Sequence, residues 1–371
     1  MNRFGFIIHP LFPKDLARHY PIVKYLPDRL IEEFLKRKKP VVASTITGVR
    51  SKTGVETEGW FIGLPMVPRQ MMAGGLPLDF IYEKISMCVD LATEQGAQLI
   101  GLGAFSSVVG DGGVTVAGRS KIGVTTGNSY TVATAIAGTK RAVQLLDIDM
   151  SNATLAVVGA TGSIGRTCAQ VLGREFGKVI LIGRDLERTQ AVCAEMPNAV
   201  ASINVSDIKA ADAIITVSSA GKELIIPDHL KPGCVVCDVA RPRDVSIRVA
   251  KERPDVLVIE GGVVSVPGNV EFGFNFGFPK HTAYACMSET MILALEGDPS
   301  LYNFTVGKDV SVEQVDKITE LAVKHGFELA GFRSFEKAVD DDAIKRARKA
   351  RTMAPTIPRV VHPGTPDLQG G

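Results

Sequence analysis

Three glycines spaced three residues apart, Gly159, Gly162 and Gly165, follow an apolar run at residues 154–158 and precede a helix-favouring stretch. Glycines in this position allow a tight turn, a close approach of the backbone to a pyrophosphate, and close packing of the helix on the strand. The first amides of such a helix also face the phosphate charge. A glycine turn without a ligand is the alternative, and the strands that follow argue against it. The pattern predicts a dinucleotide-binding loop whose contacting residues are Gly159, Thr161, Gly162, Ser163, Ile164 and Gly165.

The residue at the end of the second strand of such a domain separates NAD from NADP. An acidic side chain about 20 residues beyond the first glycine is usual where the ribose 2′-hydroxyl is bound. This chain instead has Arg184 there, with Arg188 one helical turn further. A guanidinium suits a 2′-phosphate, so we predict NADPH as the cofactor. The alternative leaves Arg184 solvated and makes Asp185 the N-cap of the next helix.

Loops that follow the later strands should surround the nicotinamide, because ligands bind beyond the carboxyl ends of parallel strands. These loops are at residues 217–220, 238–242 and 260–262. Of the residues in these loops, we assign Ser218 to the cofactor site.

Cys286 stands early in a predicted helix at residues 283–296 and is the candidate nucleophile. Unpaired amides and the helix dipole favour a thiolate at such a position. A cysteine that only fills space in a core is the alternative. Glu289, three residues on, shares the face of Cys286 and could either transfer a proton or make packing and capping contacts. His281 could assist only if the helix begins after it.

Donors for an oxyanion could come from two glycine-rich stretches in the first half of the chain, at residues 101–110 and 125–128. Ser106, Ser107 and Asn128 carry suitable hydroxyl and amide groups. Contacts that only stabilise the loops are the alternative for each of them.

The residues around Cys286 form the pattern Ala-Cys-x-x-Glu-x-Met-x-Leu-x-Leu-Glu-Gly at 285–297. The chain also has Thr-Thr-Gly-Asn at 125–128, Gly-Ala-Phe-Ser-Ser at 103–107 and Lys-His-Gly-Phe at 324–327. With the glycine loop, these stretches resemble the cyanobacterial long-chain acyl-[acyl-carrier-protein] reductases, in family order and up to about residue 330.

The resemblance implies an NADPH-dependent reductase that takes a fatty acyl group from acyl-carrier protein, or from acyl-CoA, onto Cys286. Reduction of this acyl-enzyme then gives a fatty aldehyde. The sequence departs from the family at Tyr130, where those reductases have a histidine, and over residues 268–280.

Two other functions remain open. One is an NADP-dependent alcohol or hydroxy-acid dehydrogenase of the shikimate-dehydrogenase type, which needs a Lys–Asp acid–base pair that we do not find in the sequence. The other is a non-catalytic NADP-sensing module, in which Cys286 would be replaceable.

Alternating strands and helices over residues 152–265 predict a Rossmann domain. Residues 1–127 predict a smaller α/β substrate lobe, which a helix at 128–151 links to it. Helices at 266–335 are expected to pack back on the first lobe, and the charged, then Pro-rich residues 336–371 to form a mobile tail. The predicted fold class is α/β, with a Rossmann doubly wound parallel sheet plus a smaller α/β substrate lobe completed by C-terminal helices.

The 42 basic and 40 acidic residues give a net charge of +2, which offers no reason to expect nucleic acid as a partner. No apolar run reaches the ~18 residues of a membrane span, and the N-terminal run is too short for a signal peptide, so we expect a cytoplasmic protein. Six scattered cysteines are expected to be reduced. The one close pair, Cys234 and Cys237, lies in a predicted buried strand, so we expect no metal site. The apolar composition would allow a homo-oligomer.

Overall fold

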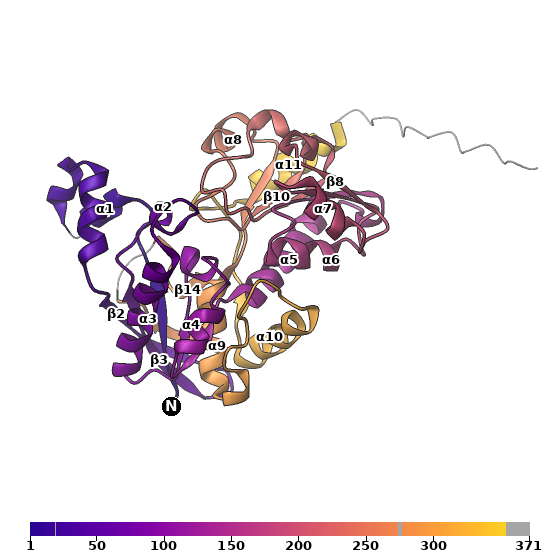
Figure 1. Ribbon diagram of the computed structural model, residues 1–371. Coiled ribbons are helices and arrows are strands. Elements are labelled where there is room, and N and C mark those ends of the chain that lie inside the picture. Colours follow the sequence, from indigo (N-terminus) through magenta and orange to yellow (C-terminus); the bar gives the residue numbers. More distant parts are fainter. Residues whose placement is uncertain (19, 274–276, 354–371) are drawn as a thin grey trace, which may run out of the picture.

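The computed structural model describes residues 1–18, 20–273 and 277–353, which form two α/β lobes (Figure 1). The Rossmann lobe is built on six strands in the order β11-β10-β9-β6-β7-β8, and every neighbouring pair is parallel. The chain enters at β6 and winds outward in both directions, which is the doubly wound arrangement. This confirms the predicted fold class. The strands are β6 (Thr154–Val158), β7 (Lys178–Ile182), β8 (Ala199–Ser202), β9 (Ala213–Thr216), β10 (Val235–Asp238) and β11 (Leu257–Glu260).

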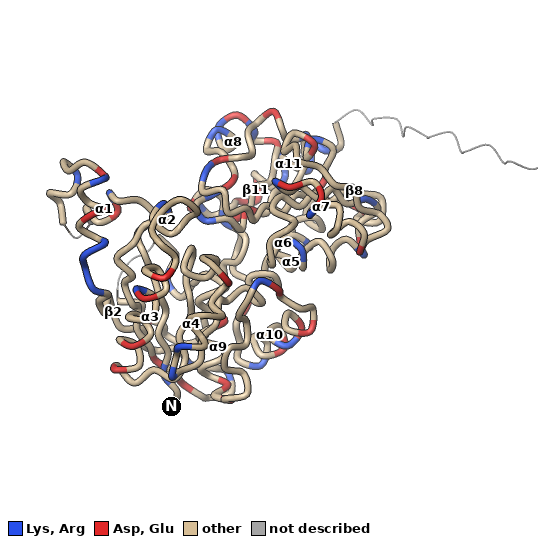
Figure 2. Tube along the Cα trace, viewed as in Figure 1, with Lys and Arg blue, Asp and Glu red and all other residues tan. Residues whose placement is uncertain are grey.

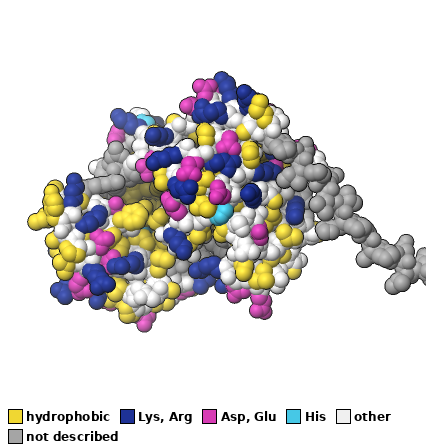
Figure 3. Space-filling view, turned by 90° about the horizontal axis from the view of Figure 1, so that it is seen from above, with side chains coloured by type: hydrophobic (Ala, Val, Ile, Leu, Met, Phe, Trp, Pro, Cys, Tyr) yellow, Lys and Arg dark blue, Asp and Glu magenta, His cyan; other side chains and the backbone are white. Residues whose placement is uncertain are grey.

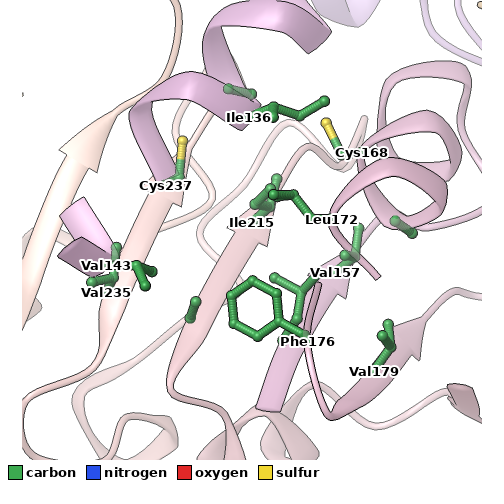
Figure 4. Packing of buried hydrophobic residues seen from close by; sticks show 14 of the residues in the cluster. Ile136, Val143, Val157, Cys168, Leu172, Phe176, Val179, Ile215, Val235 and Cys237 are labelled. Carbon is green, nitrogen blue, oxygen red and sulfur yellow. The ribbon is translucent and has the colours of Figure 1, made fainter. Parts of the chain in front are cut away.

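These strands are apolar along almost their whole length because helices cover both faces of the sheet. On one face, strand side chains pack against α5 (Asn128–Leu145), α6 (Ser163–Leu172) and α7 (Leu186–Cys193). Figure 4 shows Val157 and Ile215 of the sheet against Ile136, Cys168 and Leu172 of the helices. The other face is covered by η5 (Val205–Ala210) and α8 (Ile247–Glu252).

Cys234 and Cys237 belong to opposite faces of this sheet. Cys237 lies in the core beneath α5 and α6, whereas Cys234 lies in the core on the other side. Thiols on opposite faces of one sheet cannot share a metal ion or a disulfide bond. Burial raises the pKa of both thiols to about 12.

The second lobe has a mixed sheet in the order β13-β2-β3-β1-β4-β5. β2 runs antiparallel to its neighbours, and the remaining pairs are parallel. α3 covers one face, and α9 with α10 covers the other. The elements are β1 (Arg3–Ile8), β2 (Val41–Arg50), β3 (Glu56–Gly63), α3 (Leu78–Glu94), β4 (Leu99–Gly101), η3 (Ala104–Ser107), α4 (Val114–Arg119), β5 (Gly123–Thr125), β13 (Gly268–Glu271), α9 (Ala285–Glu296), η7 (Pro299–Leu301) and α10 (Val312–His325).

Several segments join the two lobes. α5 packs on α6 and β10 of the Rossmann lobe and on α9 and α10 of the other. A small antiparallel sheet of β14 (Thr282–Tyr284), β12 (Val263–Ser265) and β15 (Glu328–Leu329) lies where the chain leaves the Rossmann domain. Segments within residues 266–335 contact the first lobe, and they add the edge strand β13 to its sheet, which the sequence pattern did not indicate.

The N-terminal part of the first lobe carries a separate small unit around α1 (Asp28–Arg37), which projects away from the body in Figure 1. Its core is a cluster of four buried side chains, Val23, Ile31, Leu35 and Val67. The other elements of the unit are η1 (Pro13–Arg18), η2 (Pro21–Tyr25) and α2 (Pro68–Met71).

The predicted tail differs from the structure up to Met353. β17 (Lys337–Ala338) pairs with β16 (Arg333–Ser334), and α11 (Asp341–Met353) packs on the Rossmann lobe. The prediction of mobility is wrong here because Ala347 enters the core beside α5, Arg351 donates to the Asp212 carboxylate, and Arg348 donates to the Leu145 carbonyl oxygen at the end of α5. Residues 354–371, the rest of the predicted tail, lie outside the described residues.

None of the described helices is long and apolar enough to span a membrane.

Candidate active site

The glycine loop has the geometry that a dinucleotide needs. Gly159 follows β6 with φ +86°, and a Cβ there would lie 2.8 Å from the carbonyl oxygen of Val217. At Gly165 a Cβ would lie 2.3 Å from the Gly159 carbonyl oxygen, so glycine lets α6 approach the strand. Gly162 is the N-cap of α6 and no side chain caps this end in the described structure. The first amides of α6, from Ser163 and Ile164, are therefore free to bind a phosphate.

Arg184 lies just beyond the carboxyl end of β7, next to this loop. The preceding residue, Gly183, has its ideal Cβ position 3.2 Å from Cγ2 of Thr161, so the two turns are in contact. Arg184 and Arg188 are both exposed, and no ion pair is found for either among the described residues. Asp185 accepts a hydrogen bond from the Arg188 amide at 3.1 Å, so it caps α7, the role that the alternative interpretation gave it. The two guanidinium groups remain available to an anion.

Ser218 follows β9, with its Cα 3.2 Å from the ideal Cβ position of Gly159. Its amide and hydroxyl donate to the buried Asp244 carboxylate at 2.9 and 2.6 Å. Burial raises the pKa of Asp244. Ser218 thus stands beside the cofactor loop, but both of its donors are used to hold the turn.

Cys286 is half-buried in the first turn of α9, which begins after Tyr284. The residues just before it contact the carboxyl edge of the Rossmann sheet. The Ala285 amide donates to the Gly262 carbonyl oxygen at 2.7 Å, and Arg241 Nε donates to the Tyr284 hydroxyl at 3.2 Å. Gly262 and Arg241 belong to the loops after β11 and β10, so Cys286 lies beside the edge where a nicotinamide is expected.

On its other side Cys286 touches the turn that begins α5. Gly127 has φ +72°, and a Cβ there would lie 2.3 Å from the Cα of Cys286. Asn128 is the first residue of α5 and is nearly buried. No hydrogen bond of its side-chain amide is found in the described chain. Asn128 therefore directly follows the glycine that touches the cysteine, and its amide is a candidate donor.

The local charges act on the thiol in opposite directions. Burial raises the pKa of Cys286 to about 12, and the Glu289 carboxylate acts in the same direction. Hydrogen bonding from the Met287 amide and the positive charge of Arg241 lower it. The free protein consequently holds Cys286 as a thiol at neutral pH.

Glu289 is fully buried, and hydrogen-bond donors surround its carboxylate. Thr125 donates to Oε1 at 2.5 Å and Thr305 at 2.8 Å, while the Tyr130 amide donates to Oε2 at 2.8 Å. Burial raises the pKa of Glu289 against these hydrogen bonds. Because Tyr130 lies in the first turn of α5, Glu289 caps α5 from α9. This fits the packing and capping alternative for Glu289 and fixes the Gly127 turn against Cys286.

The serine candidates use their hydroxyl protons within their own turn. Ser106 Oγ donates to the Gly103 carbonyl oxygen at 2.8 Å, and Ser107 Oγ donates to that of Ala104 at 2.6 Å. His281 precedes β14, and its Nδ1 is buried without a hydrogen-bond partner in the described structure. The helix does begin after His281, but β14 separates it from Cys286. The structure thus brings Cys286, Glu289 and Asn128 together and leaves the serines as loop residues.

Comparisons with known proteins give a family match and several distant relatives. The sequence model of the shikimate / quinate 5-dehydrogenase family matches residues 140–260, which cover the Rossmann sheet. The aminotransferase PigE of Serratia sp. (strain ATCC 39006) is 30% identical over 361 residues, which are 92% of this chain and 41% of PigE. The chain thus spans about two fifths of PigE.

The long-chain acyl-[acyl-carrier-protein] reductase of Synechococcus elongatus is 28% identical over 330 residues, which are 85% of this chain and 94% of the reductase. This chain is a distant homologue of both proteins. Among solved structures, glutamyl-tRNA reductase from Methanopyrus kandleri matches 48% of this chain and 46% of its own, with 23% identity and a TM-score of 0.29. The chain has a Rossmann domain of the NAD(P)-binding type.

The sequence indicated the loop at residues 238–242 of this Rossmann domain but not the position of Arg241 within the site. Its guanidinium lies 5.4 Å from the centre of the Tyr284 ring, and its Nη1 donates to the Ala240 carbonyl oxygen at 2.7 Å. Its Nη2 is buried without a hydrogen bond. Arg241 is thus a cation held at the cofactor edge next to the cysteine helix. An arginine three residues beyond a buried strand of a Rossmann domain was the signal that could have identified it.

Proposed function

We propose that this protein is an NADPH-dependent reductase of fatty acyl thioesters that forms a fatty aldehyde through an acyl group on Cys286. The observation that supports it most directly is the contact of the Cys286 helix with the loops after β10 and β11. This contact puts a half-buried sulfur beside the edge of a Rossmann sheet where a nicotinamide belongs. A cysteine in a packed core far from that edge would have argued against the proposal.

The residues present fit NADPH. The uncapped amides of Ser163 and Ile164 would bind the pyrophosphate, and Arg184 with Arg188 would bind the 2′-phosphate. Three strand spacings separate β6 from β11 in the sheet, about 14 Å, which an extended dinucleotide can span toward the cysteine. When bound, NADPH supplies a hydride to the carbonyl carbon of the acyl group.

The protein's own groups carry the acyl transfer. The Cys286 sulfur attacks the thioester carbonyl carbon, the bond to the carrier's sulfur breaks, and the thiol proton leaves with the carrier as its new thiol. Asn128 would donate a hydrogen bond to the oxyanion formed on attack. Arg241 would stabilise negative charge on the sulfur, whose high pKa otherwise opposes the step. Hydride addition would leave an alkoxide, which takes one proton from solvent to become the hemithioacetal on Cys286. The carbon–sulfur bond then breaks, the hydroxyl proton passes to the sulfur, and the aldehyde leaves.

The acyl-carrier protein is the acyl donor we favour, with acyl-CoA as the other. This choice rests on the homologous reductase, whose name states an acyl-carrier-protein substrate and whose sequence aligns with most of this chain. The match of PigE over nearly the whole chain adds support for a shared two-lobe unit.

The test is mass spectrometry of the protein after incubation with acyl-carrier protein or acyl-CoA carrying a fatty acyl group, without NADPH. We expect one added acyl mass on the peptide that contains Cys286. Cys286→Ala should lose this label and all aldehyde formation while it keeps NADPH binding. Cys193→Ala, which removes a partly exposed cysteine of α7, is the matched control and should be labelled like the parent.

An enzyme that forms aldehyde normally after Cys286→Ala would disprove the proposal. The family match at residues 140–260 keeps a shikimate-dehydrogenase type of hydride transfer as the second candidate. That candidate predicts NADP-dependent oxidation of a hydroxy acid and no acylated peptide.

A further inference from the structure

Residues 11–42, which we call the α1 projection, comprise η1, η2, α1 and the first two residues of β2, and they expose an unusual share of the apolar side chains. Of the twenty large apolar residues that are exposed in the described chain, nine belong to these residues. Tyr25 is 85% exposed, Ile22 68% and Tyr20 61%. Isolated exposed apolar residues are normal on a soluble surface, but a cluster of this kind marks an interaction site. The nine are Phe12, Tyr20, Ile22, Tyr25, Leu26, Leu30, Phe34, Val41 and Val42.

The same residues carry an excess of positive over negative charge. Residues 11–42 contain eight basic and four acidic residues, a net charge of +4, whereas the whole chain has +2 and the remainder therefore −2. Four of the basic residues are consecutive, from Lys36 to Lys39, and appear as a blue run between α1 and β2 in Figure 2. No ion pair is found for Lys24, Arg29 or Lys39 within the described residues. These charges are therefore available to an external anion.

The shape of the α1 projection favours a flat partner over a bound peptide. Its own small core of Val23, Ile31, Leu35 and Val67 holds the helices together, so the exposed apolar groups are not missing core contacts. They stand on a protruding part of the molecule, and Figure 3 shows hydrophobic side chains beside basic ones along that edge. A peptide helix needs a groove. Apolar and aromatic tips flanked by lysines instead suit the interfacial layer of a bilayer.

We propose that the α1 projection docks this protein on an anionic lipid surface. Tyr20, Ile22 and Tyr25 enter the headgroup layer, and the basic run at residues 36–39 lies against the lipid phosphates. We choose an anionic partner because of charge complementarity. The α1 projection has a net charge of +4 whereas the whole chain has a net charge of +2, so this surface attracts negative charge. The inference does not depend on the proposed function, although a fatty acyl substrate and aldehyde product would make such a location useful.

Flotation of the full chain with lipid vesicles tests the proposal. We expect the protein to float with vesicles of phosphatidylcholine and phosphatidylglycerol in equal parts, and to stay in solution with phosphatidylcholine alone. High salt should release it, because screening shortens the reach of the lysine charges. Absence of binding to the anionic vesicles at low salt would overturn the proposal.

Two double variants separate the apolar and the charged contributions. Lys38→Gln with Lys39→Gln should weaken binding to anionic vesicles about tenfold or more, since each lysine near such a surface contributes roughly 1 kcal/mol. Ile22→Ser with Tyr25→Ser should also abolish flotation. Both pairs are exposed and outside the small core, so circular dichroism and cofactor binding should be unchanged.

Matched controls change the same residue types elsewhere on the surface. Val200→Ser with Val323→Ser, and Lys209→Gln with Lys251→Gln, alter exposed residues of the rest of the chain and should float like the parent. Equal loss in the controls would overturn the proposal. Two other results would overturn the proposal. One is a dimer of the parent protein that the double variant Ile22→Ser, Tyr25→Ser converts to a monomer. The other is a parent protein that binds acyl-carrier protein but no vesicles, with this binding lost in the same double variant. The first result would assign the surface to a second copy, and the second to an acidic protein.

Discussion

At the residue scale, the reactivity of Cys286 depends on groups from three separate segments. Glu289 lies one turn on in α9, Asn128 opens α5, and Arg241 follows β10. Burial sets the pKa of the thiol at about 12, and the positive charge of Arg241 opposes that effect. A thiol that stays protonated until a substrate arrives is protected from oxidation, because the thiolate is the form that oxidants attack.

Arg184 gives a prediction about cofactor choice. Arg184→Ala should weaken NADPH binding about tenfold or more, because a hydrogen-bonded charge pair contributes roughly 1.5–3 kcal/mol, and should leave NADH binding nearly unchanged. Titration of nucleotide fluorescence measures both affinities. Arg174→Ala, at an exposed arginine just beyond α6, is the control and should change neither. Equal losses for NADPH and NADH would contradict the assignment of the 2′-phosphate site.

Asp238 gives a prediction about pH. Burial raises the pKa of Asp238 to about 6, well above the value of about 3.9 in an unfolded chain. The native state therefore keeps this proton between about pH 4 and pH 6 while the unfolded state loses it. The free energy of unfolding should decrease by about 3 kcal/mol as the pH rises through that window.

Asp238→Asn removes this titration and should flatten the pH dependence by that amount. It also removes an acceptor, because the carboxylate accepts from the amides of Val245 and Ala240 at 3.0 and 3.1 Å, so stability at every pH should fall. Urea unfolding at a series of pH values measures both effects. Asp316→Asn, at an exposed position of α10, is the control. A slope that persists in Asp238→Asn would assign the pH dependence to another group.

Among the residues of the candidate site, those that stand in a local sequence pattern could be identified from the sequence. The three glycines, Arg184 and Cys286 stand in patterns tied to local structure, so they could be found. The partners of Glu289 could not, because Thr125, Tyr130 and Thr305 come from distant parts of the chain and meet only in the folded state. The same holds for the pairing of Arg241 with Tyr284.

At the element scale, the first turns of α5 and α9 form one unit. Glu289 of α9 accepts the amide of Tyr130 in α5, and the Gly127 turn lies directly on the backbone of Cys286. A shift of either helix would therefore move both the cysteine and the candidate oxyanion donor.

Gly127→Ala should disturb this unit for two separable reasons. A non-glycine residue at φ +72° costs roughly 1–2 kcal/mol, and the new Cβ would also overlap the Cα and Cβ of Cys286. Gly54→Ala isolates the first effect, because Gly54 has φ +90° with open space around its Cβ position. We expect about 1 kcal/mol lower stability for Gly54→Ala with normal acylation, and a larger loss with little acylation of Cys286 for Gly127→Ala. Equal behaviour of the two variants would show that the close contact is unimportant.

Elements with strong local signals can be recognised in the sequence, and elements that depend on tertiary contacts cannot. α10 has a capping box of Ser311 and Gln314 and ends at Gly326 with φ +90°, so its periodicity and both of its ends are visible in the sequence. The edge strand β13 contains two exposed polar residues and a glycine, and forms only because β2 offers it a partner. α11 is rich in charge and buries one alanine, which gives almost no apolar pattern.

At the scale of the whole molecule, the chain visits each lobe twice. It builds most of the first lobe, crosses along α5 to the Rossmann lobe, returns for β13, α9 and α10, and finally crosses back to α11 (Figure 1). α11 covers the end of the Rossmann sheet opposite the cofactor loop. Arg351 pairs at 2.7 Å with Asp212, which precedes β9, and Arg348 Nε donates at 2.8 Å to the Leu145 carbonyl oxygen at the end of α5. The last crossing therefore ties the cofactor lobe to the helix that links both lobes.

If α11 is part of the folded core, a charge at its buried position should destabilise the whole lobe. Ala347→Asp would bury a carboxylate with no cation at hand in that apolar cluster, which should lower the free energy of unfolding by roughly 3 kcal/mol or more. Lys349→Asp puts the same side chain on the exposed face of α11 and should change stability by about 0.5 kcal/mol or less. Urea unfolding followed by circular dichroism measures both. Equal stability of the two variants would mean that α11 is dispensable to the fold. Loss of NADPH binding only in Ala347→Asp would show that the cofactor loop depends on a helix at the far end of its sheet.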